Sequence, residues 1–405
     1  MGCCGKVNKI YQLKIIAMIK ITKDEFRERI SRIQEVLKER GLDGLMVYGD
    51  EYRKENLRYV SNSWPIFERN ACFIPKRGEP VLACAAEGET YAREMCVWGD
   101  IRNVKEFACV TVPEEIDYPM AKFSSFHEII EEILGGGRKL GITGFWDIPG
   151  PIYDRILNSV SGLEVINSDD ILINLRVIKS EMEISCLKES GRIACEAYKK
   201  LMEVCEPGRT ELMVAGQAEG EARVQGAEAI TFDVFGSGRR ADTIVGRPTG
   251  KIIGDGDMIM AALAIQYEGY TTTVEYPFVC GRMKDDQKRM LEILFEAANV
   301  QQGYLSGGVT SGEMVRAVRE VFRKHGASAY DIYPPMHGIG LAEAESPYPD
   351  SSSSYKFKSG MCVNSDISLF GHPGGSNRIE EGFVITDSGP VSLTPYIREL
   401  CAKGI

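Results

Sequence analysis

The residues best suited to chemistry lie in the C-terminal half of the chain, in segments whose patterns predict strands. His337 precedes a Gly-Ile-Gly turn, Asp366 follows an alternating apolar stretch, and Glu380 lies within an expected strand over residues 378–386. Burying a carboxylate in a strand is costly without a partner, so Glu380 is expected to be paired. A neutral imidazole beside a carboxylate has a raised pKa, which suits His337 to proton transfer near pH 7. The alternative for His337 is a core histidine bonded to the backbone.

Four further residues extend this candidate set. Glu275 lies in a β-rich stretch, where the alternative is an exposed position on an edge strand. Arg239 and Arg240 follow a glycine, and solvated loop charges are the plainer interpretation for both. His372 lies among glycine and proline residues, which also fits a plain surface turn. Arginines combined with buried carboxylates would suit a small zwitterion held at its two ends.

Composition narrows the class of protein. The 405 residues suggest about two or three domains, and 44% hydrophobic with 26% charged residues is ordinary for a globular enzyme. A net charge of −10 argues against nucleic-acid and anionic-membrane partners, which require clustered Lys and Arg. The sequence contains no apolar run of about 18 residues, so no membrane span is expected. Twelve scattered cysteines predict reduced thiols and a cytoplasmic location.

The first part of the chain predicts an α/β layer domain over residues 22–170. Thr22 and Glu25 have the spacing of a capping box, and Gly41 stands where the helix should end. Short strands are expected after this helix, followed by another helix. The strands cover residues 45–48, 71–74 and 81–85, and the helix covers residues 124–134.

Residues 1–21 are expected to be a separate leader without a function. The Met-Gly-Cys-Cys start hints at lipidation, but Lys6 stands where the myristoylation pattern needs Ser or Thr. The apolar patch that follows is too short for a signal peptide. Met18 is our favoured initiator.

The second part, residues 171–405, predicts an order of helix, helix and strands that occurs twice. Ser180 and Glu183 form a capping box for the first long helix, which stops before Pro207. Residues 207–214 are echoed faintly by residues 308–315, so we expect a duplicated α+β half. The predicted segments are helices 180–204, 210–225, 285–304 and 311–325, and β-rich stretches 229–279 and up to about residue 393.

Five short motifs in this part, together with the helix entry at residues 175–184, resemble the creatinase, aminopeptidase P and prolidase family. They stand in the family's order and spacing at residues 246–249, 254–257, 269–270, 337–341 and 378–381. The resemblance covers residues 22–396 and implies an α/β N-terminal domain followed by an α+β pita-bread catalytic domain. It also implies a homodimer in which the N-terminal domain reaches the partner's active site.

The family's two-metal site is altered in this chain. Members with metal use two Asp, one His and two Glu, because hard cations prefer several oxygen ligands. By resemblance, these positions hold Ala262, Thr273, His337, Asp366 and Glu380. Without both Asp carboxylates, a two-metal site is not expected. No cofactor is therefore expected, and the alternative is a single divalent ion on His337, Asp366 and Glu380.

The site pattern is most similar to the metal-independent creatinase branch. There, a glutamate at the position of Glu275 works with the carboxylate at Asp366 to hold a substrate guanidinium. An N-domain Phe-x-Arg, matched here by Phe67 and Arg69, holds the substrate's carboxylate. The family's two active-site histidines are replaced, one by Val245 and the other by Ala344.

The function expected from the sequence is therefore a metal-independent C–N hydrolase of creatinase type. Its substrate would be a small zwitterionic guanidino, amidine or cyclic amidine compound. Glu275 and Asp366 would hold the cationic nitrogens, His337 would pass the proton, and Glu380 would orient His337. One alternative is an Xaa-Pro dipeptidase or aminopeptidase with a single metal. A second is a non-catalytic pita-bread binding protein.

Overall fold

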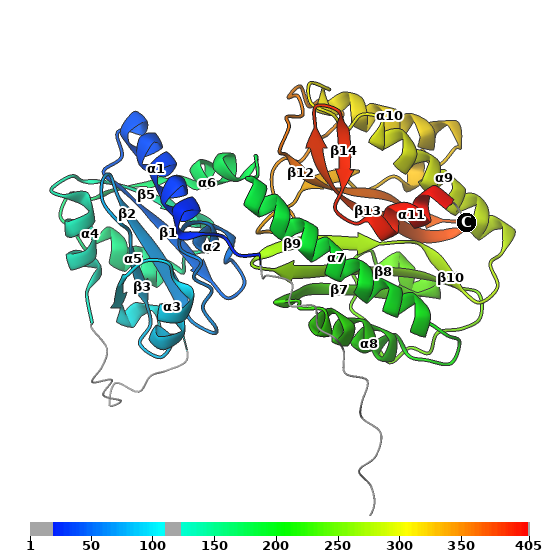
Figure 1. Ribbon diagram of the computed structural model, residues 1–405, viewed down its shortest axis with the longest axis horizontal. Helices are drawn as coiled ribbons and strands as arrows, with labels where there is room; N and C mark the ends of the chain where they lie inside the picture. The colour runs from blue at the N-terminus through cyan, green and yellow to red at the C-terminus, as the bar shows by residue number, and fades with distance from the viewer. Residues whose placement is uncertain (1–18, 110–122, 404–405) are drawn as a thin grey trace, which may run out of the picture.

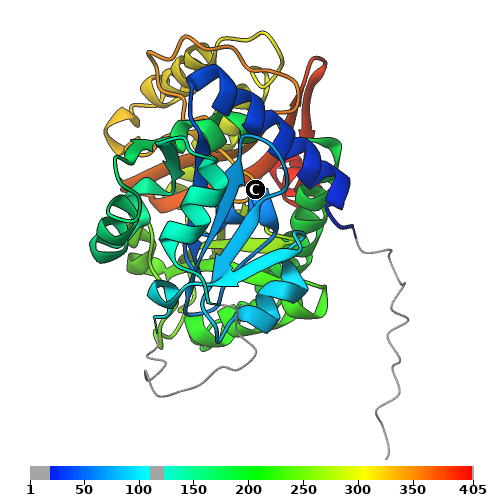
Figure 2. The same ribbon diagram turned by 90° about the vertical axis from the view of Figure 1, so that its left-hand side faces the viewer.

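The computed structural model describes residues 19–109 and 123–403, which form two β-sheets with helices packed on them (Figures 1 and 2). The expected leader, including Met18, lies outside the described residues apart from residues 19–21. Among the described helices, none combines the length and the apolar character needed to cross a bilayer.

The first sheet has six strands in the order β4-β3-β2-β1-β5-β6. Parallel and antiparallel pairs alternate along it, as expected for an α/β layer. The strands are β1 (Gly44–Asp50), β2 (Arg69–Pro75), β3 (Val81–Cys84), β4 (Asp100–Asn103), β5 (Lys139–Thr143) and β6 (Glu164–Asn167). The helices are α1 (Lys23–Arg40), α2 (Glu55–Ser61), α3 (Glu89–Met95), α4 (Phe126–Leu134), α5 (Gly150–Leu157) and α6 (Asp169–Arg176).

The second sheet has eight strands, with the path β10-β8-β9-β13-β12-β11 and with β7 and β14 attached to β8 and β13. Its strands are β7 (Ala229–Ser237), β8 (Asp257–Tyr267), β9 (Tyr270–Glu275), β10 (Phe278–Cys280), β11 (Met336–Gly338), β12 (Cys362–His372), β13 (Gly375–Thr386) and β14 (Gly389–Ser392). Its helices are α7 (Glu181–Val204), α8 (Glu211–Val224), α9 (Asp285–Gln302), α10 (Ser311–Lys324) and α11 (Pro395–Lys403).

The expected duplication is visible in this second sheet. Helices α7 and α8 precede strands β7–β10, and helices α9 and α10 precede strands β11–β14. The two halves meet where β9 pairs with β13, so the sheet is continuous across the repeat. The boundary we place between residues 170 and 171 falls inside α6, and it stays a prediction.

Helix ends largely follow the predicted caps, with one correction. The box at Ser180 and Glu183 forms in both directions, and Gly41 ends α1 with a left-handed φ of 67°. At the start of α1, Thr22 accepts from the backbone of Glu25, but the return bond predicted for the Glu25 side chain is not made. Instead that carboxylate accepts from Arg29 at 2.7 Å and from the Ser180 hydroxyl at 2.6 Å. Glu25 therefore ties α1 to the start of α7.

A buried arginine strengthens this contact between the two sheets. Arg29 of α1 is 1% exposed, and its Nη2 donates to the Tyr270 hydroxyl of β9 at 3.0 Å. The same nitrogen lies 3.5 Å from Glu183 of α7, whose carboxylate accepts from Tyr270 at 2.9 Å. The guanidinium also stacks 4.4 Å from the centre of the Tyr59 ring. One cation thus partners groups from both parts of the chain.

We predict that Arg29→Met will lower the free energy of unfolding by about 3–5 kcal/mol, because it leaves Glu25 and Glu183 without their buried partner. Urea unfolding followed by circular dichroism measures this. The matched control is Arg27→Met on the same helix, whose pair with Asp24 is exposed and should change the value by less than about 1 kcal/mol. Equal losses in the two variants would contradict the role given to Arg29.

Candidate active site

One row of facing residues crosses four strands at the centre of the second sheet. Ala262 of β8 pairs with Glu275 of β9, Glu275 with Glu380 of β13, and Glu380 with Asp366 of β12. Residues that face each other on neighbouring strands lie on the same face of the sheet, and like charges in such positions repel. The sheet register therefore gathers three buried carboxylates that need a cation.

Arg378 supplies a cation from within the chain. It lies two residues before Glu380 on β13, so its side chain is on the same face. Its Nε is 2.9 Å from Glu275 and 2.7 Å from Glu380, and all three side chains are at most 3% exposed. Burial raises the pKa of both carboxyls, and Arg378 opposes this rise. Arg378 is therefore the main electrostatic partner of this half of the row.

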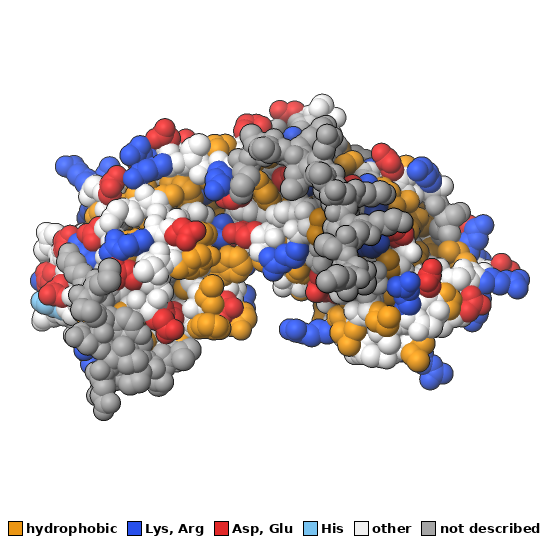
Figure 3. Space-filling view, turned by 60° about the horizontal axis from the view of Figure 1, so that its bottom comes forward, with side chains coloured by type: hydrophobic (Ala, Val, Ile, Leu, Met, Phe, Trp, Pro, Cys, Tyr) orange, Lys and Arg blue, Asp and Glu red, His pale blue; other side chains and the backbone are white. Residues whose placement is uncertain are grey.

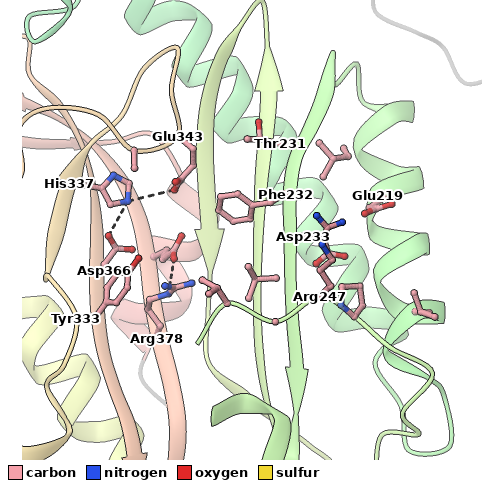
Figure 4. A pocket seen from close by; sticks show the side chains of 18 residues that line it. Glu219, Thr231, Phe232, Asp233, Arg247, Tyr333, His337, Glu343, Asp366 and Arg378 are labelled. Atoms are coloured by element: carbon pink, nitrogen blue, oxygen red, sulfur yellow. Dashed lines mark ion pairs between the residues drawn. The ribbon is translucent and has the colours of Figure 1, made fainter. Parts of the chain in front are cut away.

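His337 forms a second cluster with two other carboxylates (Figure 4). Its Nε2 is 3.0 Å from Asp366 Oδ2 and 3.6 Å from Glu343 Oε1. Its Nδ1 is 2.9 Å from the Gly338 carbonyl, an acceptor, so Nδ1 carries a proton. Burial lowers the pKa of His337, but the two carboxylates outweigh burial and raise it to about 10. Both interpretations of His337 thus hold in part, because one ring nitrogen serves the backbone and the other faces the site.

Glu343 was not anticipated from the sequence. It comes from the loop after β11, and its Oε1 accepts a hydrogen bond of 3.0 Å from Thr273 Oγ1. Burial raises the pKa of its carboxyl, and His337 opposes this rise. Thr273 stands where the resemblance expects an aspartate. A carboxylate from another part of the chain therefore lies beside the position of the missing one.

The site opens into a cavity of about 610 Å³, a size typical of small-molecule sites. His337, Glu343, Asp366, Arg378 and Glu380 line one wall of it. The remaining lining residues are Leu212, Glu219, Ile230, Thr231, Phe232, Asp233, Val234, Val245, Gly246, Arg247, Pro248, Tyr333 and Ala344. Val245 and Ala344, which replace the family's histidines, therefore form part of the cavity wall.

The other predicted residues lie elsewhere. Glu275 is fully buried behind Arg378, so the alternative of an exposed edge position is wrong. Arg240 is 3.0 Å from the buried Glu211, whereas Arg239 and His372 line a separate shallow cavity. The structure does not bring these last three residues into the main cavity.

Phe67 and Arg69 lie in the N-terminal domain, outside the main cavity of their own chain. Phe67 is 66% exposed and has a left-handed φ of 63°, a strained conformation for a bulky residue. Figure 3 shows hydrophobic side chains gathered beside the hollow between the two domains, on the side of the N-terminal domain.

The site does not fit the family's two-ion arrangement. Ala262 and Thr273 provide no carboxylate, and the guanidinium of Arg378 lies against Glu275 and Glu380. Within the described part of the chain, no three His, Cys, Asp or Glu side chains are already grouped as a complete ligand set. His337 and Asp366 nevertheless fit as two ligands of one ion, because Asp366 Oδ2 is buried and accepts no hydrogen bond.

Comparison with known proteins places both parts of the chain. Residues 185–387 match the model described as Metallopeptidase family M24, and residues 29–178 match the Creatinase/Prolidase N-terminal domain. The chain is 29% identical to the Xaa-Pro dipeptidase of Pyrococcus furiosus over 73% of this chain and 85% of that protein. It is 25% identical to the Xaa-Pro dipeptidase of Pyrococcus horikoshii over 93% and 99% of the two chains.

Solved structures agree on the fold. The prolidase from Pyrococcus horikoshii OT3 superposes with a TM-score of 0.78 at 23% identity, covering 91% of this chain and 98% of that one. The X-Pro aminopeptidase from Thermotoga maritima gives a TM-score of 0.78 at 21% identity, covering 90% and 97%. The predicted α/β domain followed by a pita-bread domain is confirmed.

The expectation of a metal-independent hydrolase of creatinase type is contradicted. The similar proteins are named as Xaa-Pro dipeptidases, and the matching model is that of a metallopeptidase family. The structure gives a physical reason at the residue level. Glu275, expected to hold the guanidinium of a substrate, already holds that of Arg378.

We predict that Arg378→Met will lower the free energy of unfolding by about 3–5 kcal/mol, because Glu275 and Glu380 lose their buried partner. Adding Glu275→Gln to this variant should recover part of the loss, since it removes one of the two uncompensated carboxylates. Chemical unfolding of both variants and of Glu275→Gln alone gives the coupling energy. No recovery in the double variant would show that Arg378 does not act through Glu275.

Proposed function

Because this chain belongs to metallopeptidase family M24, we propose that it hydrolyses the peptide bond of small Xaa-Pro substrates with the help of one divalent ion. The observation that carries this proposal is the group formed by His337, Asp366 and Glu343 on the cavity wall. The names of the similar proteins support the substrate class.

Two broader predictions stand on the family itself. The expected enzyme class, a hydrolase that acts on C–N bonds, is confirmed by the match to the peptidase family. The same family implies a divalent metal, which goes against the expectation that no cofactor is needed. The alternative in that expectation, a single ion, is the one adopted in our proposal.

The side chains of the cavity divide the work between them. When bound, a divalent ion polarises a carbonyl oxygen and makes water more acidic. His337 and Asp366 are its proposed protein ligands. Arg378 is fixed by two carboxylates on the same wall, and this orients its guanidinium to donate hydrogen bonds to the substrate. Val245 and Ala344 cannot carry a proton, so proton transfer at the scissile bond falls to Glu380, which also lines the cavity.

We further propose a homodimer and a cytoplasmic location. The exposed, strained Phe67 and the hydrophobic side chains near it support contact with a second copy, in which Phe67 and Arg69 would approach the partner's cavity (Figure 3). The ten described cysteines are all free thiols, which supports a reducing compartment.

We predict that protein stripped with a chelator will not cleave Ala-Pro or Met-Pro, and that adding manganese, cobalt, iron or zinc will restore cleavage. Release of free proline measures the reaction. His337→Ala should lose about 100-fold or more of this activity, because it removes an ion ligand and an active-site ring together.

The control is His325→Ala, which alters an exposed histidine paired with Glu296, far along the chain from the cavity residues. It should retain full activity. Equal cleavage with and without the chelator would contradict the role of an ion. If no added ion gives any Xaa-Pro cleavage, the proposed substrate class is wrong.

A further inference from the structure

We propose that Glu343 is the third protein ligand of a single divalent ion on His337 and Asp366, and that Arg378 replaces the second ion of the family's site. This inference deepens the proposed function and rests on it for the reaction, but ion binding itself can be tested without any substrate. Glu343 stands at none of the five ligand positions that the resemblance gives.

The spacing around His337 is that of ligands sharing one ion. Two atoms that each lie about 2.1 Å from a metal are about 3.0–3.4 Å from each other in common geometries. His337 Nε2 is 3.0 Å from Asp366 Oδ2 and 3.6 Å from Glu343 Oε1. A small movement of Glu343 therefore suffices to complete the set. Nδ1 of the ring faces the Gly338 carbonyl, which orients Nε2 toward the ion.

Asp366 provides an independent sign of a missing cation. Its side chain is 2% exposed, and its Oδ2 accepts no hydrogen bond within the described structure. A buried carboxylate oxygen without a donor is costly. Since Asp366 Oδ2 points at His337 Nε2, an ion between these atoms would satisfy both.

Thr273 and Glu343 together compensate for a lost ligand. Thr273 cannot supply the carboxylate that the family has at this position. Its hydroxyl instead donates to Glu343 Oε1 at 3.0 Å and holds that carboxylate beside His337. The Glu343 side chain is 17% exposed at the cavity wall, which leaves it room to move.

Arg378 explains why only one ion is proposed. Its Nε takes up Glu275 and Glu380, including the glutamate that the resemblance assigns to the metal. A second dication beside this guanidinium would meet strong repulsion in a buried site. The guanidinium contributes one fixed positive charge where the family uses an ion. Figure 4 shows Arg378 and the group around His337 side by side on the same wall.

The test is cobalt binding to the chelator-stripped full chain, followed by calorimetry and by the absorption spectrum of the bound ion. We expect one ion per chain, and Glu343→Gln should weaken binding about 10- to 100-fold and change the spectrum. Thr273→Val should weaken binding by a smaller factor, because it removes only the hydrogen bond that orients Glu343.

The matched control is Glu219→Gln, which neutralises a carboxylate that also lines the cavity but carries no printed contact with His337 in the described structure. Its affinity for cobalt should equal that of the unmodified chain. Circular dichroism identifies variants that fail to fold, and Glu343→Asp, which shortens the ligand but keeps its charge, should bind more tightly than Glu343→Gln.

Two results would overturn the inference: two ions per chain, or an unchanged affinity and spectrum in Glu343→Gln. Failure of the proposed function gives a different pattern. In that case one cobalt ion binds and depends on Glu343, but no Xaa-Pro substrate is cleaved.

Discussion

Burying several carboxylates at the centre of one sheet is the constraint on which the rest of the site depends. Glu275, Glu380 and Asp366 face one another across β9, β13 and β12, and each is at most 3% exposed. In a medium of low dielectric such a row is strongly repulsive unless positive charge lies within it. Arg378 offsets one half of the row, and His337 faces the other.

The same row joins the two halves of the duplicated domain. The register between β9 and β13 brings Glu275 opposite Glu380, although each strand belongs to a different repeat. The chemistry of the site is therefore placed where the halves meet, and neither half could build it alone. The N-terminal domain is tied to this sheet through Arg29, which contacts Tyr270 at the start of β9.

The substitutions in this chain are consistent with one another when the site is considered as a whole. Two carboxylates are lost at Ala262 and Thr273, and two are present that the metal pattern does not require, at Glu275 and Glu343. Glu275 pairs with Arg378, and Glu343 receives a hydrogen bond from Thr273. Charge has thus been redistributed around the cavity. This pattern fits a peptidase-family site with one ion better than the creatinase-type site that the sequence alone favoured.

The sequence by itself determined the local structure and the family. The capping box at Ser180, the glycine at the end of α1 and the ordered motifs depend on neighbouring residues, so they could be predicted from spacing. Arg378 also left a signal, since it lies two residues before Glu380 on one strand. Only the tertiary structure decided which charges meet: Thr273 and Glu343 are 70 residues apart, and Glu275 and Arg378 are 103 apart. Their contacts arise from strand register and loop position, which local sequence patterns do not specify. For this reason Glu275 was correctly selected as a buried functional carboxylate, but its partner was not.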